Sequence, residues 1–542
     1  MANYVIGVDF GTLSGRAVLV DAQSGQIAAE SVLEYPHGVM TDQGPAWALQ
    51  DPMDYLAVLE RTVPSVLREG GVCPEEVKAI GWDVTSCTML PALSDGTPLS
   101  ETAGFRNHAH AYVKLWKHLA AAPQAKRIEE LAKAECPEML SGYGGKVSSQ
   151  WMLPKVLQIS EEAPEVYEAA ELFLEVIDWL TLVLTGTLVR SSCGAGFKSF
   201  WSQERGYPDP AFLKKLHPMM ETLCEKQLRG PIVYPWKAAG HLTREWAGRL
   251  GLSPGTIVAG SIIDAHAGLP GSGVAEAGTV LMSVGTSTCH MIFSEENHSV
   301  PGICSAAKDS VLPDLYAYEA GQACVGDLLD WFVRNSVPAR EFEAAKAKGL
   351  SIHGHLCAQA ELLPPGANGL LALDWWNGQR SPYVDDRLSG LMLGMTIRTT
   401  PAQQYRALME STAYGTRLIL ETFEQGGVPV EKVVACGGIS RKNPLMMQIY
   451  ADVLNRPVRV TAQLQTAALG AAILAASAAK LHETPEQTVR AMTKPAESIY
   501  FPDAERVARY EELYRQYRAL AEYFAEESPV MHRLVTVKSP CA

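Results

Sequence analysis

One pattern, a strand-like run that ends in a glycine turn and continues as a second strand-like run, occurs twice in this 542-residue chain. The first copy lies in residues 4–20 and the second in residues 278–293. Each turn combines glycine with hydroxyl residues: Gly11, Thr12 and Ser14 in the first copy, and Gly285, Thr286 and Ser287 in the second. Because 274 residues, about half the chain, separate Gly11 from Gly285, we expect two domains built on one plan.

The first turn has the features of a phosphate-binding loop between antiparallel strands. The chain contains no GxxxxGK[ST] string, so it lacks the Walker loop that opens a helix. A hairpin can instead bind phosphate through exposed backbone amides and hydroxyl groups, and Arg16 follows the turn as a cation. Asp9, at the end of the strand, can hold a hydrated Mg²⁺ ion through metal-bound water. An ordinary hairpin with an Asp-Gly turn explains the same stretch without a ligand.

The net charge of −14 argues against a nucleic-acid partner or an anionic membrane surface. The proportions of hydrophobic residues, 47%, and charged residues, 20%, are those of an ordinary soluble globular protein. The apolar run at 467–479 is too short and too rich in alanine to span a bilayer, and it predicts a closely packed helix. The chain opens without a signal-peptide pattern, and its eleven cysteines, the last of them Cys541, are scattered singly. We therefore expect reduced thiols and a cytoplasmic location.

Strands that alternate with helices after an initial meander, in both halves, predict an α/β fold with mixed sheets. Apolar spacing predicts helices over 53–69, 109–133, 163–184, 325–334, 403–425 and in the tail from residue 503. We interpret the apolar stripe of the tail as core packing, with a subunit contact as the alternative. The Gly/Pro-rich segment 268–273 marks a boundary between domains 1–272 and 273–542.

Asp264 is the candidate general base. It follows a predicted buried strand at 257–263, and ligands in α/β folds lie at the carboxyl ends of strands. Phosphoryl transfer to an alcohol needs one carboxylate that can take the proton of the acceptor. A helix N-cap is the alternative role for Asp264. Gly437 and Gly438 follow the predicted strand 432–436 and either let a nucleotide lie against bare backbone or form a simple strand-to-helix turn.

Two charged residues stand in unusually apolar surroundings. Lys198, among aromatic residues and glycines, either contacts a polar ligand or extends its charge to the surface. Glu319 follows a strand of alternating aromatic residues, where a carboxylate is costly without a hydrogen-bond partner, and a sugar hydroxyl is one candidate for that partner. The histidines have no carboxylates at a helical ligand spacing, so we interpret them as structural or surface residues.

Several strings of the sequence, taken together, resemble the FGGY family of carbohydrate kinases over nearly the full length. They begin at Asp9, Ser149, Asp264, Gly285, Glu319, Gly390 (with Glu410) and Gly437. Further strings resemble the family members that phosphorylate L-ribulose, and these begin at Tyr112, Ser283, Asp374 and Val453. The resemblance implies two ribonuclease-H-like, actin-like ATPase domains around a central cleft, with the sugar held mainly by the first domain and ATP by the second.

The same resemblance implies the reaction: ATP-dependent phosphorylation of the O5 hydroxyl of L-ribulose, with Mg²⁺, in L-arabinose catabolism. Asp264 would take the proton from O5, and the two glycine hairpins would flank the phosphates. By position in the matching motifs, the sugar contacts would be Ser86, Lys198 and Glu319, and the nucleotide would be lined by Gly326, Gly437, Gly438 and Asn443. The expected partners are a ketopentose and ATP, without nucleic acid or membrane, and a homodimer is left open.

Two places depart from the family pattern near the sugar. Ser86 stands where many relatives have alanine, and residues 259–264 replace a common Gly-Asn-Val-Asp form. Small changes at buried hydroxyl-binding positions decide which sugar epimer fits. The alternatives are therefore a kinase for another ketopentose (D-ribulose or xylulose), a non-kinase ATPase of the actin fold, and a sugar-binding regulator without catalysis.

Overall fold

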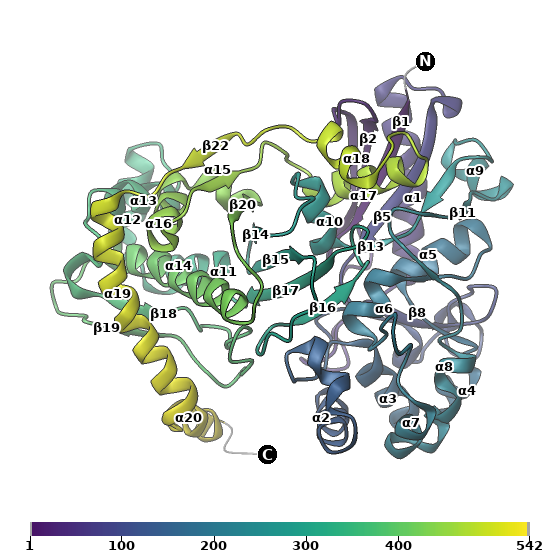
Figure 1. Ribbon diagram of the computed structural model, residues 1–542, viewed down its shortest axis with the longest axis horizontal. Coiled ribbons are helices and arrows are strands. Elements are labelled where there is room, and N and C mark those ends of the chain that lie inside the picture. Colours follow the sequence, from purple (N-terminus) through teal and green to yellow (C-terminus); the bar gives the residue numbers. More distant parts are fainter. Residues whose placement is uncertain (1–2, 539–542) are drawn as a thin grey trace.

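Two seven-stranded mixed sheets form the framework of the protein, which we describe from a computed structural model for residues 3–538 (Figure 1). The first sheet has the order β11-β12-β5-β1-β2-β3, and β13 also pairs with β5. Its strands are β1 (Tyr4–Phe10), β2 (Ser14–Asp21), β3 (Ile27–Glu34), β5 (Val77–Val84), β11 (Ala238–His241), β12 (Ile257–Ala259) and β13 (Ile262–Ile263). Strands β1, β2 and β3 are antiparallel, whereas β1, β5 and β12 run parallel.

The second sheet repeats this arrangement in the order β16-β17-β15-β14-β20-β21-β22. Its strands are β14 (Thr279–Val284), β15 (Thr288–Ser294), β16 (Ser305–Lys308), β17 (Tyr316–Gln322), β20 (Lys432–Cys436), β21 (Val458–Val460) and β22 (Ser498–Tyr500). Strands β14, β15 and β17 are antiparallel, and β14, β20 and β21 run parallel. Two mixed sheets on one plan confirm the predicted fold class. We call each sheet with its helices a lobe.

Helices surround both sheets. Those of the first half are α1 (Pro52–Gly70), α2 (Ala122–Glu135), α3 (Met152–Glu162), α4 (Pro164–Ala169), α5 (Val176–Thr185), α6 (Ser192–Lys198), α7 (Pro210–Leu216), α8 (Leu223–Lys226), α9 (Arg244–Leu250) and α10 (Asp264–Gly271). Those of the second half are α11 (Gly326–Ser336), α12 (Ala339–Ala347), α13 (Ile352–Glu361), α14 (Pro401–Gln425), α15 (Gly438–Lys442), α16 (Pro444–Leu454), α17 (Thr466–Ala478), α18 (Pro485–Met492), α19 (Ala504–Glu522) and α20 (Val530–Lys538). Four predicted helices correspond to α1, α11, α14 and α19.

Two predicted helices are wrong in part. The segment 109–133 contains β7 (Val113–Lys114) before α2, and the segment 163–184 contains β8 (Leu172–Glu175) between α4 and α5. Both strands pair with β6 (Met89–Ala92) in a small sheet of order β4-β7-β6-β8, in which β4 is Leu49–Gln50. A short apolar run fits a strand or a helix equally well, and pairing with a strand that is distant in the sequence decides between them here.

Helix α17 lies between the two sheets and packs on β1, β5 and α10 (Figure 1). The packing is so close that side chains cannot fit at the crossings. A Cβ atom on Gly470 would stand 1.8 Å from the carbonyl oxygen of Ala267, and one on Gly7 would stand 1.9 Å from that of Ala468. The predicted closely packed helix is therefore confirmed, and it fixes the position of α10. Since α17 comes from the second half of the chain but covers the first sheet, the division at residues 272–273 stays a prediction.

The tail helix α19 packs its apolar stripe into the second lobe. Tyr510, Tyr514 and Tyr517 are buried in the hydrophobic core, and Leu513 and Leu520 pack against it. The interpretation of the stripe as core packing is confirmed.

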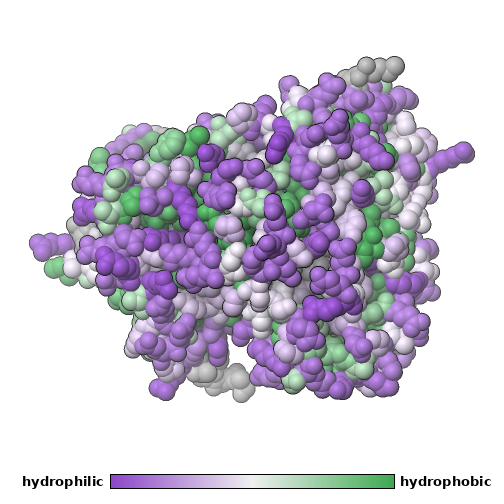
Figure 2. All heavy atoms as spheres, viewed as in Figure 1, coloured by the Kyte–Doolittle hydropathy of each residue, from purple (hydrophilic) through white to green (hydrophobic). Residues whose placement is uncertain are grey.

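Figure 2 shows hydrophilic residues over most of the visible face, and no helix within residues 3–538 is both long and apolar enough to cross a bilayer. The ten cysteines in this range are free, and Cys541 lies outside it.

We expect Gly470→Ala to lower the free energy of unfolding by about 1–3 kcal/mol, because a methyl group must displace backbone at the α10–α17 crossing. Alanine is otherwise the better helix former by about 1 kcal/mol, so helix propensity predicts the opposite sign. Denaturant unfolding of both variants and the parent measures the effect. The control is Gly248→Ala in α9, where a Cβ meets nothing within 4 Å. A stabilised Gly470→Ala variant would contradict the packing argument.

Candidate active site

Three aspartates lie where neighbouring strands of the first sheet end. β1 and β5 run parallel with Asp9 opposite Asp83, and β13 pairs with the end of β5 so that Asp264 follows directly. Asp264 is the first residue of α10, whose N-cap is Ile263, so the alternative role of Asp264 as a cap is not observed. Asp9 and Asp264 keep part of their surface exposed, whereas Asp83 is 0% exposed. The strand ends therefore bring three carboxyl groups to one edge of the sheet.

Crowding of these groups controls their protonation. Burial, followed by the charge of Asp9, raises the pKa of Asp264 to about 7. Burial also raises the pKa of Asp9, although Asp83 and Arg16 act to lower it. Burial and the charges of Asp9 and Asp264 raise the pKa of Asp83 well above its usual range, and among the described residues no hydrogen-bond donor reaches its oxygens. Burial and the neighbouring carboxyl groups thus favour the protonated form of Asp83, and the pKa of Asp264 lies close to neutral pH.

A buried ion pair connects the two lobes beside this cluster. Lys198, the last residue of α6, places Nζ 2.8 Å from Oε2 of Glu319 on β17, and both side chains are 4% exposed. The other carboxylate oxygen, Oε1, accepts a hydrogen bond of 2.5 Å from Arg380. Burial alone would raise the pKa of Glu319, but Lys198 and Arg380 lower it to about 2. The partners of Glu319 in this structure are therefore two cations, where the sequence suggested a sugar hydroxyl.

His266 completes the surroundings of Glu319. Its Nε2 atom lies 3.5 Å from Oε2 of Glu319, and burial lowers its pKa to about 4. The imidazole is therefore neutral near pH 7, and neither ring nitrogen has a hydrogen-bond partner among the described residues. The positive charge beside Glu319 consequently comes from Lys198 and Arg380 and not from the histidine.

The loop that carries Ser86 is held by a buried lysine. Lys155 on α3 is 0% exposed, and its Nζ atom donates to the carbonyl oxygens of Cys87 (2.7 Å), Leu115 (3.0 Å) and Lys114 (3.3 Å). Ser86 itself is half-buried, and its hydroxyl lies 3.2 Å from the thiol of Cys87. Lys155 thus ties the Ser86 loop to the neighbouring segment, and Lys198 is close enough to act electrostatically on the pKa of Cys87.

The first glycine hairpin is a tight, exposed turn between β1 and β2. The backbone N–H of Gly11 donates to the carbonyl oxygen of Ser14 at 3.0 Å, which closes the turn. The indole N–H of Trp116 donates to Oγ1 of Thr12 at 3.1 Å. Arg16 follows in β2, opposite the strand end of β1. The predicted turn between antiparallel strands is confirmed, and its phosphate contacts stay a prediction.

The second hairpin is joined to the first turn of α11. The N–H of Gly285 donates to the carbonyl oxygen of Ser287 at 2.9 Å. The N–H of Gly326 donates to the carbonyl oxygen of Gly285 at 3.0 Å, and that of Val325 donates to the carbonyl oxygen of Thr286 at 2.8 Å. A Cβ on Gly326 would stand 2.7 Å from the Gly285 oxygen. Helix and hairpin therefore form one unit, in which these two amides bind protein carbonyls.

The residues expected at the nucleotide have different local roles. Gly437 has φ +94°, and a Cβ there would stand 2.4 Å from the carbonyl oxygen of Val284, so packing against β14 already requires glycine. A Cβ on Gly438 would meet nothing within 4 Å, so space lies open beside it. Asn443 accepts a hydrogen bond of 3.0 Å from the N–H of Met446 and caps α16. Of these three positions, Gly438 is the one with free space around it.

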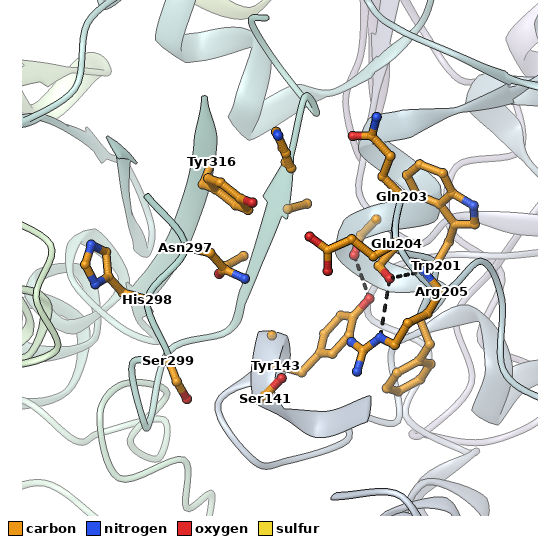
Figure 3. A pocket seen from close by; sticks show the side chains of 17 residues that line it. Ser141, Tyr143, Trp201, Gln203, Glu204, Arg205, Asn297, His298, Ser299 and Tyr316 are labelled. Carbon is orange, nitrogen blue, oxygen red and sulfur yellow. Dashed lines mark hydrogen bonds between the residues drawn. The ribbon is translucent and has the colours of Figure 1, made fainter. Parts of the chain in front are cut away.

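A cavity of about 280 Å³ opens between the lobes (Figure 3). One wall comes from the first lobe and the other from the second, and its lining includes Tyr143, Glu204, Arg205, Asn297, His298 and Tyr316. Gly196, two residues before Lys198, also lines it, as does Ala306, which follows Ser305, whose hydroxyl accepts a hydrogen bond of 3.4 Å from Lys198. The cavity therefore adjoins the segments around Lys198. None of the three aspartates is part of its wall, so we do not assign the phosphoryl-transfer chemistry to this cavity.

Sequence reasoning did not single out several residues of the site. Asp83 follows the apolar run 77–82, but the sequence alone indicates no role for it, and its register with Asp9 depends on the parallel pairing of β1 and β5. Arg380 lies inside the family string that begins at Asp374. The signal that could have marked it as a site residue is an arginine in an otherwise aromatic and polar loop. Lys155 belonged to another string, and a lysine among the apolar residues of a helix is the signal that could have marked it.

Comparisons with known proteins point to one family. The N-terminal domain of the FGGY family of carbohydrate kinases matches residues 4–271, and its C-terminal domain matches residues 280–479. A protein of Geobacillus thermodenitrificans named Ribulokinase is 47% identical over 98% of this chain and 96% of its own length. A protein of the same name from Mycolicibacterium smegmatis is 43% identical over 99% of this chain and 96% of its own length.

Solved structures show the same fold. A xylulose kinase from Rhodospirillum rubrum superposes with a TM-score of 0.81 at 23% identity, covering 98% of this chain and 100% of that one. A Plasmodium falciparum glycerol kinase with ADP superposes with a TM-score of 0.77 at 16% identity, covering 96% of this chain and 98% of that one. These likenesses agree with the two-lobed α/β architecture, and the predicted family resemblance is confirmed.

We expect Glu319→Gln to lower the free energy of unfolding by about 3–5 kcal/mol, because it leaves Lys198 buried without its counter-ion. Denaturant unfolding at neutral pH measures the loss. The control is Glu276→Gln, which removes an exposed pair with Lys432 and should cost less than about 1 kcal/mol. Equal losses in the two variants would show that the inter-lobe pair adds no more than a surface contact.

Proposed function

Because the chain belongs to the FGGY family of carbohydrate kinases, we propose that it transfers the γ-phosphoryl group of ATP to O5 of L-ribulose, giving L-ribulose 5-phosphate and ADP. The observation that carries this choice of sugar is the 47% identity, over nearly the whole of both chains, to a relative named Ribulokinase. A cytoplasmic location and the restriction to small-molecule partners belong to the same proposal. The alternative of a non-kinase ATPase does not agree with membership of a carbohydrate kinase family.

Asp264 is the general base of the proposed reaction. Its carboxyl group is held at the start of α10, partly exposed, with a pKa raised by burial to about 7. A base with a pKa near the working pH combines a useful ionised fraction with sufficient basicity. Asp264 takes the proton of the sugar's O5 hydroxyl as O5 forms its bond to the γ-phosphorus, and the bond from phosphorus to the β–γ bridging oxygen breaks to release ADP.

The sugar is held beside Asp264 by polar groups of both lobes. Lys198 comes from α6 of the first lobe and Glu319 from β17 of the second, so a sugar that binds beside this ion pair contacts both lobes. Ser86 offers a half-buried hydroxyl on the loop that Lys155 anchors. Ser261, at one departure from the family pattern, donates from Oγ to the carbonyl oxygen of Ile177 at 3.0 Å, which supports the strand before Asp264.

The glycine hairpins and Gly438 bind ATP in this proposal. Exposed amides and hydroxyls of the turn at Gly11 and of the turn at Gly285 contact the phosphates, as hairpin loops can. Open space beside Gly438 accommodates the nucleoside. Gly326 and Asn443 support this region through the hairpin unit and the α16 cap.

Magnesium fits the donor chemistry at the strand ends. Carboxylate oxygens are the ligands that Mg²⁺ prefers, and Asp9 is partly exposed in front of Asp83, whose oxygens lack a donor. Within residues 3–538, no group of three His, Cys, Asp or Glu side chains could hold a metal ion. A hydrated ion held by Asp9 through water and by ATP phosphates satisfies both observations, since Mg²⁺ usually keeps several waters. When bound, Mg²⁺ neutralises negative charge on the phosphates.

A coupled assay of ADP release tests the sugar. Purified protein with MgATP should release ADP on addition of L-ribulose, with kcat/KM higher for L-ribulose than for D-ribulose, D-xylulose or L-xylulose. The reason is that the site discriminates epimers by which buried hydroxyls are paired. A preference for another ketopentose would replace L-ribulose in the proposal, and no sugar-dependent ADP release with any of the four would overturn it.

Asp264→Asn should lower kcat with L-ribulose by about 10²- to 10⁴-fold, because the amide cannot accept the O5 proton. The dissociation constant of the sugar, measured by calorimetry without nucleotide, should change little, since size and shape are kept. Asp95→Asn, in an exposed turn, is the control and should keep parental kcat. A variant at position 264 with parental kcat would remove Asp264 from the role of base.

A further inference from the structure

The carboxylate of Glu319 is shared by two cations of different kinds. Its Oε2 atom faces Lys198 at 2.8 Å, and its Oε1 atom accepts a hydrogen bond from a terminal nitrogen of Arg380 at 2.5 Å. Both carboxylate oxygens thus have a charged partner. A sugar that reaches this place meets an anion already oriented from two sides, and its contacts depend on Arg380 as well as on Lys198.

Arg380 is held in place by its own loop and by β17. The backbone N–H and carbonyl of Gln379 exchange hydrogen bonds of 2.9 and 2.8 Å with Asp385, which closes the loop. The hydroxyl of Ser381 accepts a hydrogen bond of 3.3 Å from the N–H of Gly321, two residues after Glu319. A Cβ on Gly321 would stand 3.2 Å from a terminal nitrogen of Arg380, so the guanidinium lies directly against the strand.

Some N–H donors of the Arg380 guanidinium face only weak hydrogen-bond acceptors. Its Nε atom points to the thiol of Cys304 at 3.3 Å, and a terminal nitrogen points to the thiol of Cys289 at 3.8 Å. Thiols are weak acceptors, and burial raises the pKa of Cys289 to about 11, so that this thiol is uncharged. An arginine has five N–H donors, of which Glu319 uses one here.

Arg380 differs from its two partners in being open to solvent. Its side chain is 35% exposed, against 4% for Lys198 and Glu319. It nevertheless lies deep enough for burial to affect its pKa and close enough to share electrostatic influence on Cys289 with Asp264. A side chain that is deep and still exposed is one that lines a cleft. Arg380 contacts Glu319, whose charge acts on the pKa of Asp264, so the donors of Arg380 are available to a ligand that binds beside Glu319 and Asp264.

We propose that Arg380 is a further sugar-recognition residue, which orients the Glu319 carboxylate and donates its remaining N–H groups to hydroxyl or carbonyl oxygens of a polyhydroxy ketone. This inference rests on the proposed kinase function and extends it to a residue to which the family strings assign no role. A guanidinium supplies several donors in a fixed plane, whereas a lysine in its place supplies one compact charge. Arginine at this position therefore contributes geometry as well as charge.

Two substitutions separate these contributions. Arg380→Met should raise the KM for L-ribulose by about 10- to 100-fold, as expected for loss of hydrogen bonds to a charged group, and leave the KM for ATP within about twofold. Arg380→Lys should recover part of the loss, because lysine restores the positive charge but lacks the planar set of N–H donors of a guanidinium. The matched control is Arg387→Met, on the same loop but paired with Asp385 at the surface, which should keep both KM values.

Calorimetric titration of each variant with L-ribulose, without nucleotide, gives a readout independent of turnover. A sugar affinity of Arg380→Met within twofold of the parent would overturn the inference. If the methionine variant does not fold, as judged by its thermal transition, Arg380→Lys decides, and parental sugar affinity and KM in that variant overturn it equally. If the parent protein phosphorylates none of the ketopentoses, the proposed function fails by itself, and titration with L-ribulose still tests the role of Arg380.

Discussion

The site is organised around the electrostatic repulsion among three carboxyl groups at the ends of neighbouring strands. Asp9, Asp83 and Asp264 are brought together by the parallel register of β1 and β5 and by the pairing of β13 with β5. Like charges at such positions oppose one another's ionisation, and the pKa of the most buried group, Asp83, is raised well above its usual range. Close backbone contacts of α17 with β1 and α10 hold these two elements in place.

A second group of charged residues, centred on Glu319, accompanies the three carboxyl groups. Glu319 lies between Lys198 of one lobe and Arg380 of the other, so the cleft contains cations beside its carboxyl groups. Burial of a single ion pair is a weak source of stability, because desolvation offsets the Coulomb attraction. The arrangement is better explained as orientation of polar groups at the boundary between lobes. The charges of Glu319 and Lys198 both act on the pKa of Asp264, so in the proposed reaction the protonation of the base depends on the pair that binds the sugar.

The sequence could predict the features that depend on residues close together in the chain. Glycine turns between strand-like runs located both hairpins, and strand ends located Asp9 and Asp264. Arg380 could not be predicted in this way, because its partner Glu319 is 61 residues away in the sequence. The same limit explains β8, whose apolar run became a strand only because β6 lies beside it. Asn443 shows the reverse case, since a residue assigned to a ligand by resemblance also performs a local task as a helix cap.

Helix α17 has a consequence for the order in which the protein is made. Its neighbours β1, β5 and α10 are all synthesised before the chain reaches residue 272, whereas α17 itself begins at Thr466. Domains usually fold as units during synthesis, starting from the N-terminus. Here the first lobe cannot cover that side of its sheet until translation is almost finished. An apolar surface therefore stays uncovered on the growing polypeptide, and transiently exposed surface of this kind favours aggregation.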